Sequence, residues 1–122
     1  MQNDVKQKLA RELNYYIEKK IEFSEYYPGM NVLSSNLYKK QLEEVLAYIQ
    51  EKFGEDASKF EMYLDTIIIN MHTKAKKYKK SIYFDNENIK DIHNQGYTIP
   101  FYVDEKINKY ILLGIVEAEI VS

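Results

Sequence analysis

The sequence contains no cysteine, which excludes a disulfide framework and a thiolate metal site. Arg11 is its only arginine, and arginine is the residue that recognises phosphates and carboxylates through paired hydrogen bonds. Four glycines, at positions 29, 54, 96 and 114, lie too far apart to form a glycine-rich phosphate loop. We therefore expect neither a metal nor another cofactor.

Long apolar segments are also missing from the sequence. No run approaches the roughly 18 apolar residues of a membrane span. The first residues, MQNDVKQKLAREL, lack the apolar core of a signal peptide. These features predict a cytoplasmic protein that does not contact a membrane.

The composition is that of a folded domain, with 45% hydrophobic and 30% charged residues in 122. This length predicts a single domain over residues 1–122. Its hydrophobic pattern predicts an α+β fold, in which about three N-terminal helices pack on a small C-terminal antiparallel sheet. The helical layer covers residues 1–80. A short strand, a short helix and a β-hairpin cover residues 81–122.

Two helices are predicted in the first half of the chain. The first runs from about Val5 to Glu25 with Asn3 or Asp4 as its N-cap, and a type II turn follows at residues 27–30. The second begins after Ser34 or Ser35 and ends before a C-terminal Gly54. The apolar positions of the first helix are Val5, Leu9, Leu13, Tyr16, Ile17 and Ile21, and those of the second are Tyr38, Leu42, Val45, Leu46, Ile49 and Phe53.

The stretch Ser58–Lys80 has the clearest helical pattern in the chain. Ser58 and Glu61 stand at the spacing of a capping box, which predicts the start of a third helix. One continuous apolar stripe then follows, formed by Phe60, Leu64, Ile67, Ile68, Met71, Ala75 and Tyr78. We expect this stripe to form the centre of the core.

The pattern changes after Lys80. Ser81–Phe84 predicts a short strand, Asp85 a cap for a short helix over 86–95, and Gly96 the end of that helix. Residues 97–103 and 110–121 predict a hairpin, whose first strand is placed at a sheet edge by Pro100. Because residues 111–116 are apolar on both faces, both faces should be covered. A partner chain is one source of cover, which favours a homodimer through this strand.

The lysine cluster is the first candidate binding site, and consists of Lys74, Lys76, Lys77, Lys79 and Lys80 with Tyr78 among them. On one helix, such residues favour docking of a phosphate backbone or an acidic protein surface. A second interpretation needs no ligand, because lysines at a helix C-terminus complement the helix dipole.

Tyrosine is frequent, at 12 residues, and supplies rigid amphipathic contact area of the kind used in protein interfaces. We select Tyr97, Tyr102 and Tyr110 in the predicted hairpin as candidate contact residues. The alternative is that the tyrosines lie at the edges of the core with their hydroxyl groups in water.

Catalytic chemistry has little support in the sequence. His72 and His93 are the only histidines, and neither has a second histidine at the spacing of a metal site. No nucleophile elbow of the Gly-x-Ser-x-Gly type is present. We name no catalytic residue and no metal ligand.

A helix over 86–95 followed by a hairpin resembles the final elements of a winged-helix DNA-binding domain. The segment that would read DNA, Asp85–Asp91, carries three acids and one lysine, and these charges would repel phosphates. If this interpretation holds, the contacts would come from the lysine cluster at residues 74–80.

We expect a non-enzymatic binding protein of bacterial or phage type, such as an inhibitor, immunity or adaptor protein. Its expected partner is another macromolecule, with a protein as the first choice. The alternatives are a winged-helix-like DNA-binding regulator and a small-molecule-binding domain. The protein interpretation predicts an apolar and aromatic surface patch near the hairpin.

Overall fold

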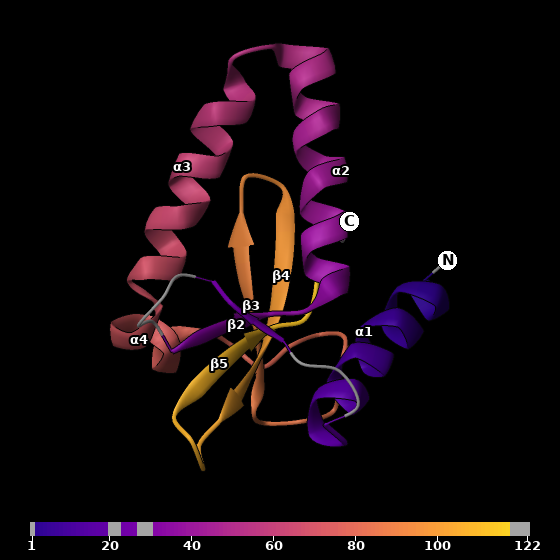
Figure 1. Ribbon diagram of the computed structural model, residues 1–122, viewed down its shortest axis with the longest axis vertical. Coiled ribbons are helices and arrows are strands. Elements are labelled where there is room, and N and C mark those ends of the chain that lie inside the picture. The colour runs from indigo at the N-terminus through magenta and orange to yellow at the C-terminus, as the bar shows by residue number, and fades with distance from the viewer. Residues whose placement is uncertain (1, 20–22, 27–30, 118–122) are drawn as a thin grey trace.

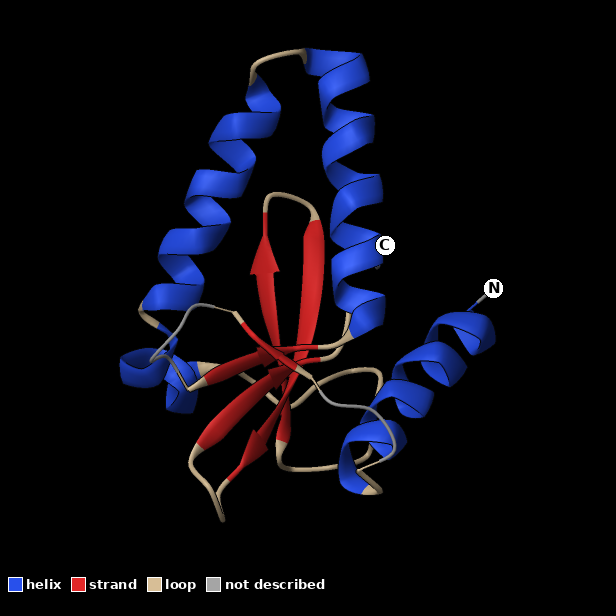
Figure 2. Cartoon of the chain, viewed as in Figure 1, coloured by secondary structure: helices blue, strands red, loops and turns tan. Residues whose placement is uncertain are grey.

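A mixed six-stranded sheet with helices on both faces forms the centre of the computed structural model, which describes residues 2–19, 23–26 and 31–117 (Figures 1 and 2). The fold is therefore α+β. The helices are α1 (Gln2–Ile17), α2 (Asn36–Phe53), α3 (Asp56–Ile69), α4 (Met71–Lys74) and the 3-10 helix η1 (Ala75–Lys77). The strands are β1 (Ser24–Glu25), β2 (Val32–Ser34), β3 (Ile89–Asn94), β4 (Tyr97–Asp104), β5 (Lys109–Leu112) and β6 (Val116–Glu117).

The sheet is larger than the predicted antiparallel hairpin with one short strand. Its order is β1-β2-β5-β4-β3, and β6 pairs with the start of β4. The β2–β5 pair is parallel and joins residues far apart in the chain, with Leu33 opposite Ile111. The sequence gives little sign of β2, because a three-residue strand is too short to show an alternating pattern.

Strand β5 is covered on both faces, as predicted. Leu112 is buried against α2 and α3, whereas its neighbour Ile111 is buried on the opposite face with Leu9 and Leu13 of α1. The helices therefore do not form one layer, because α1 lies on the other side of the sheet from α2 and α3. The reason for expecting a dimer through this strand is removed, since the chain covers both faces itself.

Helix α1 is shorter than predicted at its C-terminal end. It ends at Ile17 rather than Glu25, and Lys19 adopts a φ of 54°, a left-handed conformation that stops a helix. Ser24 and Glu25 instead form β1, in which Ser24 pairs with Ser34. The predicted caps Asn3 and Asp4 lie inside the helix. The predicted turn at 27–30 lies outside the described residues.

Helix α2 begins and ends where the sequence predicts. The Ser35 hydroxyl accepts a hydrogen bond from the Tyr38 N–H (2.9 Å) and donates one to the Leu113 carbonyl (2.7 Å). This buried side chain therefore caps the helix and attaches it to the end of β5. Gly54 ends the helix with a φ of 61°.

The third predicted helix is real but broken. It begins at Asp56, before the predicted capping box of Ser58 and Glu61, and no side chain caps it. Asn70 ends it, and both its backbone N–H (3.2 Å) and its side-chain amide (2.9 Å) donate to the Thr66 carbonyl. The predicted stripe still forms the core, since Phe60, Leu64, Ile68, Met71 and Ala75 are all buried across the break.

The predicted short strand at Ser81–Phe84 and the predicted helix over 86–95 are both wrong. Residues 81–84 form turns, and β3 occupies most of the second segment. Gln95 and Gly96 have φ values of 51° and 88° and join β3 to β4 in a two-residue hairpin. Gly96 does not distinguish the predicted helix end from the observed hairpin, because helix ends and tight hairpins both use a residue with positive φ.

Pro100 lies in the interior of the sheet, not at an edge as predicted. Its carbonyl accepts from the Leu113 N–H (2.9 Å), on the side where the partner of β4 changes from β5 to β6. The backbone N and O atoms of one strand residue point to the same side of the strand. The N–H that proline lacks would therefore point to the place where the partner of β4 changes from β5 to β6. The predicted strand over 110–121 is accordingly divided into β5 and β6, with residues beyond 117 not described.

Gly114 lies directly after β5, where side chains of α1 and α2 both approach the backbone closely. A Cβ atom there would lie 2.6 Å from Leu9 Cδ2 and 2.7 Å from Gln41 Oε1, which accepts a hydrogen bond from the Ile115 N–H.

We expect Gly114→Ala to lower the free energy of unfolding by about 1–3 kcal/mol in urea denaturation, because neighbouring groups must move. In a Leu9→Ala background the added cost should be smaller. Unchanged stability of the single variant would contradict this packing.

Candidate functional site

The α2–α3 hairpin extends beyond the sheet that it covers (Figure 1). Val45 and Ile49 of α2 are buried, but Phe53, one turn further along the same stripe, is 62% exposed. The prediction that Phe53 is buried was wrong, because the β3–β4 turn ends before the α2–α3 connection and leaves no strand beneath it. An apolar helix face is therefore uncovered at this end of the molecule.

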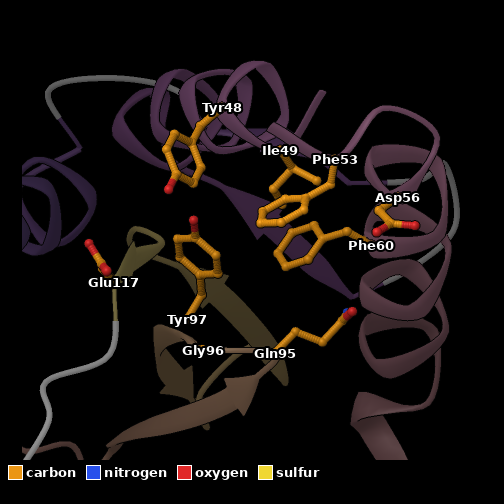
Figure 3. Close-up of a pocket in the computed structure, with 9 residues that line it drawn as sticks. All are labelled: Tyr48, Ile49, Phe53, Asp56, Phe60, Gln95, Gly96, Tyr97 and Glu117. Carbon is orange, nitrogen blue, oxygen red and sulfur yellow. The ribbon is translucent and has the colours of Figure 1, made fainter. Parts of the chain in front are cut away.

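A hollow of about 370 Å³ lies between this end of the helical hairpin and the β3–β4 turn (Figure 3). Phe60 is buried at its base and contacts the Tyr97 ring edge to face, with ring centroids 5.5 Å apart. Tyr48 is 52% exposed, and the Tyr48 and Tyr97 hydroxyl groups point toward each other from α2 and β4. The lining residues are Tyr48, Ile49, Phe53, Asp56, Phe60, Gln95, Gly96, Tyr97 and Glu117.

A second hollow of about 320 Å³ continues from the first and shares Tyr48, Tyr97 and Glu117 with it. It runs along the other side of α2 and is also lined by Val5, Gln41, Glu44, Val45, Ile115 and Val116. We call the two hollows together the Tyr48–Tyr97 groove. Residues from α1, α2, α3 and the sheet meet along it, so the complete fold is needed to form it.

The charged residues of the groove are all acidic. Glu44, Asp56 and Glu117 line it, and no lysine, arginine or histidine is among its lining residues. In the part of the chain that the structure describes, none of these three carboxylates forms an ion pair. Burial raises the pKa of the Tyr97 phenol, and the Glu117 carboxylate and Tyr48 raise it further.

The three tyrosines selected from the sequence lie in different places. Tyr97 is in the groove, whereas Tyr102 lies on the opposite face of the sheet, where its ring contacts Tyr16 with centroids 6.0 Å apart. Tyr110 lies near the lysine cluster and packs on Phe101 at 6.3 Å. The three tyrosines do not form one contact surface. Tyr102 lies five residues after Tyr97 on β4, and because successive side chains of a strand alternate, the two side chains point to opposite faces of the sheet.

The lysine cluster is not arranged on one helix face as predicted. Lys74 ends α4, Lys76 and Lys77 belong to η1, and the backbone is extended at Tyr78, before Lys79 and Lys80. The Lys80 ammonium donates to Asp85 (2.8 Å) and lies 3.7 Å from Glu87. The hydrogen bond raises the pKa of Lys80 and lowers the pKa of Asp85. Acidic neighbours therefore offset part of the positive charge.

Lys76 and Tyr110 do share a hollow, but it also contains Glu87, Glu105 and Lys90. Its charges are mixed. The segment expected to read DNA in a winged helix, Asp85–Asp91, ends inside strand β3, where Asp91 is buried and accepts a hydrogen bond from the Ile82 N–H (3.0 Å). The structural basis of the winged-helix interpretation is therefore absent.

His72 and His93 are on α4 and β3, and His93 Nδ1 lies 3.0 Å from the Thr98 hydroxyl oxygen. Among the described residues, no group of three or more His, Asp or Glu side chains is placed to hold a metal ion. Within the same residues, no helix combines the length and apolar character needed to cross a membrane.

Most of the groove was not identified from the sequence. The sequence analysis selects Tyr97, places Phe53 on the apolar stripe of the second helix and Gln95 at the end of a predicted helix, and does not select Tyr48, Asp56 or Glu117. The usable signal was the length of the apolar stripe on α2, which reaches one turn beyond Ile49. This signal has meaning only once the length of the β-hairpin beneath it is known.

Replacement of Glu117 tests the geometry of the groove. Glu117→Gln should lower the pKa of Tyr97 toward its usual value of about 10, because a nearby negative charge disfavours the phenolate. Glu105→Gln is the matched control, since it should lower the pKa of Tyr102 instead. Both are measured by NMR titration of the tyrosine Cζ signals, and equal effects of the two variants on Tyr97 would contradict the arrangement.

The raised pKa of Tyr97 also determines the direction in which stability changes with pH. The neutral phenol is favoured in the folded state. Its contribution to the free energy of unfolding is therefore complete below the unfolded pKa near 10 and is lost as the pH rises through the folded pKa.

Comparison of the chain with protein-family models gives no match, and comparison with curated proteins gives no significant match. The site is therefore interpreted from its own residues.

Proposed function

We propose that this chain is a non-enzymatic binding protein that recognises another protein through the Tyr48–Tyr97 groove. The observation that carries the proposal is Phe53, an aromatic residue on the core stripe of α2 that is 62% exposed at the end of the groove. Such a position leaves apolar area in water until a partner covers it. Tyr48 and Tyr97 add two further aromatic side chains with hydrogen-bonding hydroxyl groups.

A protein partner fits this surface better than the other two classes. The three carboxylates that line the groove repel a phosphate backbone, which argues against nucleic acid at this site. Small-molecule pockets bury most of the surface of their ligand. Tyr48 and Phe53 instead keep more than half of their own surface in water, and the groove continues along α2 into a second hollow.

Site-specific photo-crosslinking in the native host tests the proposal. With p-benzoylphenylalanine at position 53 we expect a crosslink to one defined protein, because this side chain lies at the contact. Position 62 is the matched control, since Met62 belongs to the same helical hairpin and is 58% exposed, but does not line the groove. Equal crosslinking at both positions would contradict a specific site.

Calorimetry with the purified, identified partner supplies the quantitative test. Phe53→Ala should weaken binding by about tenfold or more, since aromatic residues that a partner buries contribute a large share of the affinity. Met62→Ala should leave the Kd within about twofold, as expected for a residue outside the contact. Thermal unfolding shows that each variant is folded, and an unchanged Kd for folded Phe53→Ala would refute the site.

A further inference from the structure

The groove differs in charge from three other hollows of the described structure. The hollow beside Tyr102 contains Lys19 and Lys106 together with acids, the hollow beside Tyr110 contains Lys76 and Lys90, and a fourth contains His72. Only acids line the Tyr48–Tyr97 groove among these. An occupant that carries positive charge is therefore complementary to this hollow and not to the others.

Two acids of the groove, Glu117 and Asp56, lie near aromatic side chains. In Figure 3, Glu117 lies next to the Tyr48–Tyr97 pair, and Asp56 lies at the other end, beyond Phe53 and Phe60. A lysine or arginine side chain packs its methylene groups on aromatic rings and places its charge over a ring face or against a carboxylate. At the Glu117 end, the hydroxyl oxygens of Tyr48 and Tyr97 face each other and can accept hydrogen bonds from such a cation. At the Asp56 end, the exposed ring of Phe53 is available for stacking.

We propose that the groove binds a segment of a partner protein that carries lysine or arginine residues, with one cation between Tyr48 and Tyr97 near Glu117 and a second near Asp56. This proposal rests on the proposed function and specifies the chemistry of the partner. Arginine suits the site better than lysine, because its planar guanidinium group stacks on aromatic rings and binds carboxylates through two hydrogen bonds.

Two acids of the groove come from α2 and α3 and one from β6, so the site forms only when helices and sheet are packed together.

An NMR titration with short peptides tests the charge preference directly. The probe is acetyl-Gly-Arg-Gly-Arg-Gly-amide, and its control is the same peptide with neutral citrulline at both arginine positions. We expect saturable shifts of the amide signals of Tyr48, Phe53, Asp56, Tyr97 and Glu117 with the arginine peptide. Citrulline should weaken binding by about tenfold, since both charge-assisted contacts are lost.

Variants of the protein locate the effect. Asp56→Asn with Glu117→Gln should abolish the saturable shifts, whereas Glu25→Gln with Glu105→Gln removes the same amount of charge elsewhere and should preserve them. Absence of saturable groove shifts with the arginine peptide, equal binding of the citrulline peptide, or equal loss in both double variants would overturn the proposal. Photo-crosslinking at position 53 would still occur with a neutral partner segment, so failure of this proposal is distinguishable from failure of the proposed function.

Discussion

The rest of the structure depends on the burial of β5 on both faces and along both edges. Ile111 and Leu112 are fully buried on opposite sides of the sheet, and β2 and β4 pair with the two edges of the strand. A strand of this kind needs helices above and below it. Ser35 connects one of these helices directly to the end of β5, through its bond to the Leu113 carbonyl.

The same requirement explains the position of the candidate site. Helix α2 covers β5 and β4 and then continues past the β3–β4 turn. This turn consists of only two residues, Gln95 and Gly96. The apolar stripe of α2 is therefore longer than the sheet surface that is available to bury it. Phe53 and Tyr48 are exposed as a consequence of how the core is built, and the acids Asp56 and Glu117 stand at the ends of the same hollow. The surface that we propose for partner recognition thus continues the apolar face that packs the core.

The sequence predicted the parts of the fold that depend on local chemistry. The Ser35 cap, the Gly54 helix end, the apolar stripe from Phe60 to Ala75 and the double burial of residues 111–116 are all confirmed. The failures have physical causes: Gly96 satisfies a hairpin as well as a helix end, and the parallel pairing of β2 depends on contacts across the chain. The groove could not be predicted, because it arises from a difference in length between two elements that are distant in the sequence.

The central claim is that the uncovered end of the α2–α3 hairpin is the surface that a partner protein covers. Hydrogen–deuterium exchange of the free protein and of its purified complex, combined with carbene footprinting of side chains, measures this directly. Binding should protect the side chains of Tyr48, Phe53 and Tyr97 and slow amide exchange around Gln95 and Gly96. Protection confined to residues 74–80, with the groove unchanged, would contradict the account.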